Sequence, residues 1–246
     1  MIRLSVNVNK IATVRNSRGG DVPSVIDAVG VCIAAGSPGI TVHPRADQRH
    51  ITTQDVHDVA DFLRGFPSVE YNIEGDPRPG FIDFVASVKP TQCTLVPVMP
   101  GEITSQAGWP PDTPRTQLAS AIDALHGAGV RVSLFVDPED APIRWAADLG
   151  ADRIELYTEP YARAYERGQG DASFGKYAAA ATLAHSLGLG INAGHDLDLD
   201  NLVLFRRLPN LDEVSIGHAL VSHALFVGLD RSVREYLAVL SEPASP

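Results

Sequence analysis

The chain contains few cysteines, few lysines and no long hydrophobic run. Its two cysteines, Cys32 and Cys93, form no CxxC pair, which excludes a zinc ribbon and a redox dithiol. Isolated thiols are typical of a reducing compartment, so we expect a cytoplasmic protein. No apolar run approaches the roughly 18 residues that a membrane span needs, and the N-terminal residues lack the layout of a signal peptide. We therefore expect no membrane association.

Arginine supplies almost all of the positive charge, because the only lysines are Lys10, Lys89 and Lys176. A Schiff-base aldolase needs a reactive lysine, and only Lys10 stands just past a predicted strand. Asp and Glu number 30 against 20 Lys and Arg, which gives a formal net charge of −10. An acidic chain without a clustered basic stretch binds nucleic acid poorly, so we expect no nucleic-acid partner.

The composition is that of an ordinary globular protein, with 44% hydrophobic and 20% charged residues among 246. Short runs rich in Val and Ile alternate with longer helical patterns. We expect strands over Arg3–Val8, Gly39–His43, Val69–Glu74, Gln92–Val96, Arg131–Val136, Arg153–Tyr157, Gly190–Asn192 and Glu213–Gly217. We expect helices that include Val22–Ala35, Thr53–Leu63, Thr116–Ala128, Pro138–Leu149, Gly175–Leu187 and Ala219–Leu240.

A repeat of about 30 residues is typical of one βα unit, and several of the helices end in a glycine just before the next strand. About eight such units predict a single (β/α)8 TIM barrel over residues 1–246. A doubly wound open sheet is the alternative, but no GxGxxG motif follows the first strand. We expect Pro97–Pro114 to be a long functional loop, and Glu159–Asp171 to begin the sixth helix with an insertion.

Chemistry in a parallel barrel is found at the carboxyl ends of the strands and in the loops after them. The residues at these predicted ends are Asn7, Asn9, His43, Arg45, Glu74, Glu155, Asn192, His195, Gly217 and His218. Histidine serves readily as an acid or base, and a carboxylate inside a barrel is costly unless it has a function. The structural alternatives are a histidine that bonds a neighbouring loop and a glutamate in a salt bridge with arginine.

Phosphate binding is the second feature of these ends. The turns Asn192–His195 and Ile216–His218 contain glycine and follow the last two strands, where barrels often bind phosphate. Arg18 and Arg45 can complete anion sites by bidentate contacts, although solvated surface arginine is the default for each. A metal site built from histidines and Glu74 is a further alternative, but no HxH or HExxH spacing supports it, so we expect no metal.

These residues leave three classes open: an enzyme that joins or rearranges phosphorylated substrates, a sugar-phosphate isomerase or epimerase, and a barrel that only binds a phosphorylated ligand. Eight blocks decide between them by resemblance: NVNKIATVRNSRGG, GITVHPRADQRHI, YNIEGD, LVPVMPGEITSQAGW, RVSLFVD, RIELYTEPYA, INAGHDL and VSIGHALV. In combination and order they resemble pyridoxine 5′-phosphate synthase, and they cover nearly the whole chain.

The resemblance implies a (β/α)8 barrel with extra helices, assembled as a homo-octamer built from dimers in the cytoplasm. It implies condensation of 3-amino-2-oxopropyl phosphate with 1-deoxy-D-xylulose 5-phosphate to pyridoxine 5′-phosphate, phosphate and water, without metal or organic cofactor. By the same resemblance, His43 and Glu74 match general bases, His195 the proton donor, and Glu155 a group that stabilises the transition state.

The resemblance also assigns substrate contacts. Asn7, Arg18, Gly217 and His218 match contacts to the aminoketone phosphate, whereas Arg45, His50 and Thr104 match contacts to the deoxyxylulose phosphate. The first loop differs from the common Asn-x-Asp-His pattern, because Asn9 and Lys10 replace the last two residues. Asn9 cannot act as a base, and Lys10 brings a fixed charge that can hold a phosphate or hydroxyl. Asp196 replaces a frequent glycine beside His195.

Overall fold

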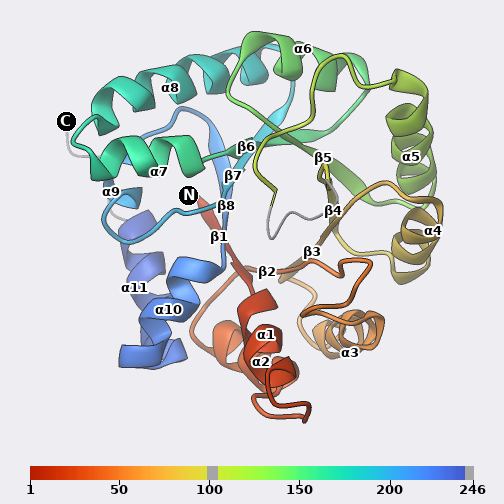
Figure 1. The fold of residues 1–246 in the computed structure, drawn as a ribbon, viewed down its shortest axis with the longest axis vertical. Helices are drawn as coiled ribbons and strands as arrows, with labels where there is room; N and C mark the ends of the chain where they lie inside the picture. Colours follow the sequence, from red (N-terminus) through yellow and green to blue (C-terminus); the bar gives the residue numbers. More distant parts are fainter. Residues whose placement is uncertain (99–104, 242–246) are drawn as a thin grey trace.

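Eight strands close into one parallel barrel in this computed structural model, each paired with the next in the chain and β8 paired with β1 (Figure 1). The structure describes residues 1–98 and 105–241. The strands are β1 (Arg3–Asn7), β2 (Gly39–Val42), β3 (Glu70–Gly75), β4 (Gln92–Leu95), β5 (Arg131–Val136), β6 (Arg153–Tyr157), β7 (Gly190–Gly194) and β8 (Leu211–Ile216). The predicted (β/α)8 barrel is confirmed.

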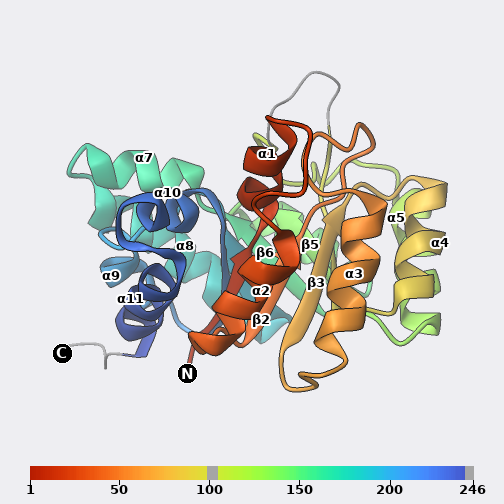
Figure 2. The same cartoon turned by 90° about the horizontal axis from the view of Figure 1, so that it is seen from below.

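The helices surround the barrel (Figures 1 and 2). They are α1 (Asn9–Asn16), α2 (Val25–Ala34), α3 (Thr53–Leu63), α4 (Pro79–Val88), α5 (Arg115–Gly127), α6 (Asp140–Asp148), α7 (Glu159–Glu166), α8 (Gly170–Ser186), α9 (Leu202–Phe205), α10 (His218–Val227) and α11 (Leu229–Ser241). Within the described ranges, no helix is long and apolar enough to cross a membrane.

The helix predictions were wrong or incomplete in several places, and neither α4 nor α9 was predicted. The predicted helix Ala219–Leu240 is two helices, because Gly228 takes a left-handed φ of 87° that ends α10 and allows α11 to turn back. The segment Glu159–Asp171 does not simply extend the next helix: it forms α7 and then a turn before α8. Helix α1 was not predicted, because its sequence has only a weak hydrophobic pattern: Ala12 is the residue that it buries.

The interior of the barrel is polar and hydrogen bonded. Ser5 Oγ lies 2.6 Å from Thr41 Oγ1, Thr94 donates to Asn72 Oδ1 over 3.1 Å, and these side chains are buried. Strand side chains alternate in direction, so the residues between them point toward the helices. Those outward residues, such as Val6 and Ile73, are apolar and fully buried in the main core. The same alternation carries polar side chains upward into the barrel mouth.

Charged side chains close the opposite end of the barrel. Arg131 Nη2 lies 2.5 Å from Glu70 Oε2, and Arg3 Nη2 lies 3.5 Å from Glu70 Oε1. Glu213 on β8 is almost completely buried beside them, 2% exposed. Burial, and then the negative charge of Glu70, raise the pKa of Glu213 to about 7, although Arg153, Arg131 and Arg3 oppose this.

The raised pKa of Glu213 predicts a stability that depends on pH. The folded state holds this proton more tightly than the unfolded state, whose carboxyl has an ordinary pKa near 4.5. Stability is therefore lost as pH rises from about 4.5 to about 7, by up to about 3 kcal/mol. Glu213→Gln should remove this loss, so the variant gains stability over the wild type at pH 8 but not at pH 4.5.

Denaturant unfolding at the two pH values measures this effect. Glu139→Gln is the matched control, because Glu139 is exposed at the start of α6. The control should leave the difference between the two pH values unchanged. The prediction is wrong if Glu213→Gln is less stable than the wild type by the same amount at pH 8 and at pH 4.5. In that case the arginine neighbours stabilise the ionised carboxylate.

Candidate active site

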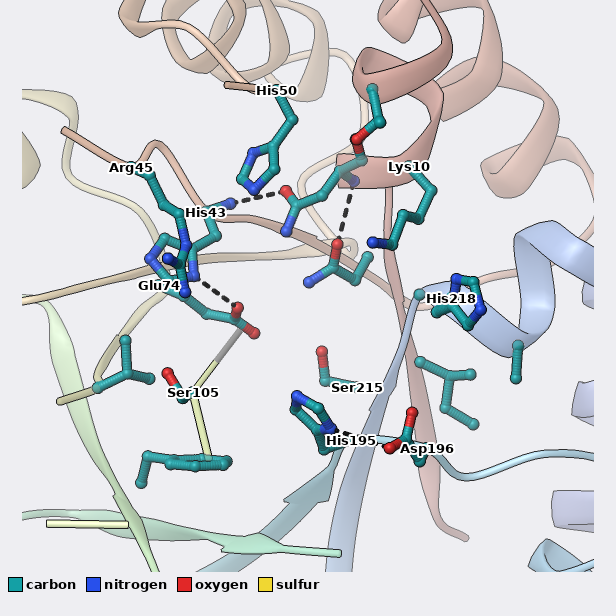
Figure 3. Close-up of a pocket in the computed structure, with 18 of the residues that line it drawn as sticks. Lys10, His43, Arg45, His50, Glu74, Ser105, His195, Asp196, Ser215 and His218 are labelled. Atoms are coloured by element: carbon teal, nitrogen blue, oxygen red, sulfur yellow. Dashed lines mark hydrogen bonds and ion pairs between the residues drawn. The ribbon is translucent and has the colours of Figure 1, made fainter. Parts of the chain in front are cut away.

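A cavity of about 520 Å³ opens at the carboxyl ends of the strands. Strand alternation explains its lining, because side chains two residues apart on a strand point the same way. Asn7, Glu74 and Glu155 each follow, by two residues, a polar side chain that points into the barrel. The lining residues are Asn7, Asn9, Lys10, Thr13, His43, Arg45, Arg49, His50, Glu74, Val96, Ser105, Phe135, Glu155, His195, Asp196, Leu197, Ser215, Ile216, Gly217, His218 and Ala219. Figure 3 shows how they converge.

His43 and Glu74 form the first acid–base pair. His43 Nδ1 lies 3.6 Å from Glu74 Oε2, and both side chains are about nine-tenths buried. His43 Nε2 is buried and has no hydrogen-bond partner among residues 1–98 and 105–241. Asn9 fixes the backbone here, because its Oδ1 accepts the N–H of His43 over 2.9 Å. Asn9 thus positions His43, a predicted base, although the Asn9 amide cannot itself act as a base.

Glu155 lies deeper, on β6, and is 5% exposed. Burial, and then the charges of Glu74 and Glu213, raise the pKa of Glu155 well above its ordinary value, although a hydrogen bond with Thr94 opposes them. The raised pKa favours the protonated form of Glu155, which can donate a hydrogen bond. Gly194 makes room for it, since a Cβ there would stand 2.5 Å from Glu155 Oε1.

Cationic side chains gather on another wall of the cavity. Lys10, Arg45 and Arg49 surround His50, and their charges, after burial and His43, lower its pKa to about 4. His50 is therefore neutral at physiological pH. Its Nδ1 accepts the N–H of Ile51 over 2.9 Å, so the proton resides on Nε2 and is available as a donor. This wall is suited to bind an anion such as phosphate.

His195 and Asp196 follow β7 on the far side of the cavity. His195 has a φ of 94° and Asp196 a φ of 58°, which is unusual for residues with side chains. His195 Nδ1 lies 3.4 Å from Asp196 Oδ2. The neighbouring imidazole of His195 lowers the pKa of Asp196, so its carboxylate is ionised at neutral pH.

The N-terminus of α10 completes the lining. Gly217 is its N-cap, and His218 is its first residue. Gly217 packs closely against β1, because a Cβ would meet Asn7 Cβ and O at 3.1 Å. The backbone N–H groups of a helix N-terminus attract anions, so this end of the cavity offers a second place for a phosphate.

The structure brings together all the predicted site residues except Arg18 and Thr104. Arg18 lies in the turn after α1, where its side chain is exposed and outside the cavity lining. Thr104 lies outside the described residues, as does part of the predicted loop Pro97–Pro114. Arg49 and Ser105 line the cavity without having been predicted. Arg49 directly precedes His50, a predicted site residue, and this position in the sequence could have indicated that Arg49 lies at the site.

The described part of the predicted loop is anchored to the barrel. Trp109 N–H donates to Phe135 O over 2.8 Å, and Trp109 Nε1 donates to Leu95 O over 2.9 Å. Ser105 donates to Pro97 O over 3.1 Å. In the same described ranges, no group of three or more His, Cys, Asp or Glu is placed to hold a metal ion.

Fold and cavity together define a (β/α)8-barrel protein whose cavity is lined by histidines and carboxylates, by cationic side chains and by a helix N-terminus. The chain belongs to the family of pyridoxal phosphate biosynthesis protein PdxJ, whose family model matches residues 4–242. Pyridoxine 5′-phosphate synthase of Bacteroides fragilis (strain YCH46) is 52% identical over 237 residues, covering 96% of this chain and 98% of that protein. The synthase of the same name from Leptospira biflexa is 49% identical over 254 residues, covering 98% of each.

Similar solved structures confirm the fold at low sequence identity. 3-Hexulose-6-phosphate synthase matches with a TM-score of 0.64 and 12% identity, over 98% of this chain and all of that chain (100%). Thiamine phosphate pyrophosphorylase from Pyrococcus furiosus matches with a TM-score of 0.60 and 12% identity, over 97% and 95% of the two chains. These likenesses show the architecture alone.

Proposed function

We propose that this protein is a pyridoxine 5′-phosphate synthase of vitamin B6 biosynthesis. It condenses 3-amino-2-oxopropyl phosphate with 1-deoxy-D-xylulose 5-phosphate and releases pyridoxine 5′-phosphate, phosphate and water. Membership of the PdxJ family and relatives of that name support the activity. The observation that carries it at the site is the convergence of His43, Glu74, Glu155 and His195, from four different strand ends, on one cavity.

Ring formation requires several proton transfers at different atoms, and one group cannot reach them all. His43 and Glu74 stand together and serve as the general bases. His195 stands across the cavity as the proton donor to the leaving group (Figure 3). Glu155 is buried and has a raised pKa, which favours its protonated form, and in that form it stabilises developing negative charge by donating a hydrogen bond. No step requires a metal or organic cofactor.

Two walls suit the two phosphorylated substrates, and holding both together supplies proximity and orientation. We assign the deoxyxylulose phosphate to the cationic wall of Arg45 and His50, with Thr104 as a further contact. We assign the aminoketone phosphate to the N-terminus of α10, where its contacts are Asn7, Gly217, His218 and Arg18. Arg18 lies outside the lining of its own cavity, so it reaches a phosphate after a loop movement or from a neighbouring subunit. Asn9 and Lys10 connect the two walls.

The function is tested by mixing both substrates with the purified protein. We expect equal amounts of phosphate and pyridoxine 5′-phosphate, measured by a phosphate assay and by mass spectrometry. Reactions that lack either substrate are the controls. Phosphate release without the ring product, or no reaction at all, would contradict the proposal.

We also propose a homo-octamer built from dimers. Leu225 and Phe226, near the end of α10, are 75% and 89% exposed. Adjacent exposed large apolar side chains are typical of a surface that another chain covers. Native mass spectrometry should show the octamer for the wild type and smaller species for Phe226→Glu. Val203→Glu, at an exposed apolar residue on α9, is the control and should leave the octamer intact. A monomeric wild type would contradict this proposal.

The proposed location is the cytoplasm. Cys32 and Cys93 are both buried free thiols. Burial raises the pKa of Cys32 to about 12 and that of Cys93 further still, so both stay protonated and unreactive. Such thiols suit a reducing compartment.

A further inference from the structure

We propose that Asp196 is a positioning residue that holds the His195 ring at Nδ1 and directs its Nε2 into the cavity. This inference rests on the proposed function, in which His195 is the proton donor. It reassigns Asp196, a predicted substrate contact, because its carboxylate faces the imidazole. Asp196 Oδ2 lies 3.4 Å from His195 Nδ1 (Figure 3). A carboxylate at one imidazole nitrogen fixes the ring and stabilises its protonated form.

The backbone of this loop is held in the unusual conformation that makes the contact. Thr158 Oγ1 lies 2.7 Å from Gly194 O and also reaches His195 O. Asn201, which is buried, donates from Nδ2 to Asp196 O over 3.0 Å. Left-handed φ values at two successive residues persist only where the surroundings enforce them. The loop therefore presents the carboxylate to the imidazole.

A carboxylate at the position of Asp196 would repel a phosphate bound nearby unless its charge is offset. The imidazole of His195 is the largest cause of the lowered pKa of Asp196, followed, beyond burial, by Arg163 and His218. Asp196 lines the cavity beside His195, and these neighbouring groups offset its negative charge there.

Other titratable groups face this pair from the neighbouring elements. On β6, the Tyr157 ring lies 5.4 Å from the His195 ring, edge to face, and Glu155 lies beneath Gly194. His218 begins α10, and Arg163 on α7 acts on Asp196. Burial raises the pKa of Glu155, whereas the Asp196 carboxylate lies within ion-pair distance of His195.

The pH profile of Asp196→Asn tests the proposal. The amide keeps the size of the side chain but removes its charge, so His195 should lose its proton at lower pH. We expect the alkaline limb of the kcat profile to move down by roughly one pH unit. At pH 8 the variant should be at least about tenfold slower, with KM for both substrates within about twofold of the wild type. Loss of packing alone would not move a pH limb.

Asp200→Asn is the matched control, because Asp200 is an exposed carboxylate in the same loop. It should leave kcat and the pH profile unchanged. A raised KM with unchanged kcat in Asp196→Asn would assign Asp196 to substrate binding and overturn the proposal. An unchanged pH profile and kcat would overturn it as well.

Imidazole 15N NMR on the ligand-free protein separates this inference from the proposed function. The His195 signals, assigned with His195→Gln, should titrate at lower pH in Asp196→Asn than in the wild type. This comparison can be made even if the wild type makes no pyridoxine 5′-phosphate. The proposed function would then fail, while the interaction between Asp196 and His195 would still be supported. Identical titration curves in the two proteins would show that Asp196 does not act on His195 and would overturn the inference.

Discussion

Glu74→Gln is expected to lower pyridoxine 5′-phosphate formation by about a thousandfold or more while both substrates still bind. A positioned general base contributes roughly a hundredfold to ten-thousandfold to a reaction. Glu74 also places a carboxylate beside His43, since His43 Nδ1 lies 3.6 Å from its Oε2. The amide removes both roles together, so the loss should lie toward the upper part of that range. Turnover and calorimetric substrate binding measure the two effects separately.

Glu155→Gln is the informative comparison for this variant. Burial and nearby carboxylates raise the pKa of Glu155, which favours its uncharged form. A glutamine there keeps a neutral donor of similar shape, so we expect a much smaller loss than for Glu74→Gln. Circular dichroism and thermal unfolding should show that both variants fold. Near-normal turnover by Glu74→Gln would exclude Glu74 from the mechanism.

The sequence predicted most of the site because strand alternation is a strict rule. Once the end of each strand is known, the residues that point into the barrel mouth follow, as for Asn7 and Glu74. Glu155 could face either the barrel interior or the helices by sequence alone, and the structure places it in the cavity lining. The glycine turns located His195 and His218 for the same reason. These predictions needed only the order of strands and the direction of a parallel barrel.

Other features depend on contacts that no local pattern encodes. Arg49 looks like an ordinary surface arginine, and its place in the lining is set by the loop after β2. The carboxylate of Asp196 faces His195 only because both residues adopt left-handed backbone conformations. The break at Gly228 also depends on backbone conformation, since the hydrophobic pattern runs through it. Sequence patterns assign residues to faces, but tertiary packing sets how loops turn.

The loop before α5 provides the second large effect, at Gly108. A Cβ on Gly108 would lie 2.4 Å from the backbone of Val136 and Asp137, closer than any real contact. Those atoms belong to β5 and the residue after it, which cannot shift without opening the barrel. Gly108→Ala must therefore push the loop outward and break the two hydrogen bonds of Trp109 to the barrel.

We expect Gly108→Ala to lose about 3 kcal/mol of stability, since overpacking costs up to that amount. For a chain of this size the midpoint of thermal unfolding should fall by roughly 6 °C or more. The displaced loop also carries Ser105 away from the cavity, so kcat/KM should fall at least about tenfold.

Gly127→Ala is the matched control for this variant, because it adds the same methyl group at the end of α5, where nothing lies within 4 Å. Alanine is favoured over glycine in a helix by up to about 1 kcal/mol, so this variant should be equal to or more stable than the wild type. Activity should not change. If Gly108→Ala behaves like Gly127→Ala in thermal unfolding and in turnover, the close packing of this loop against β5 does not hold the cavity wall in place.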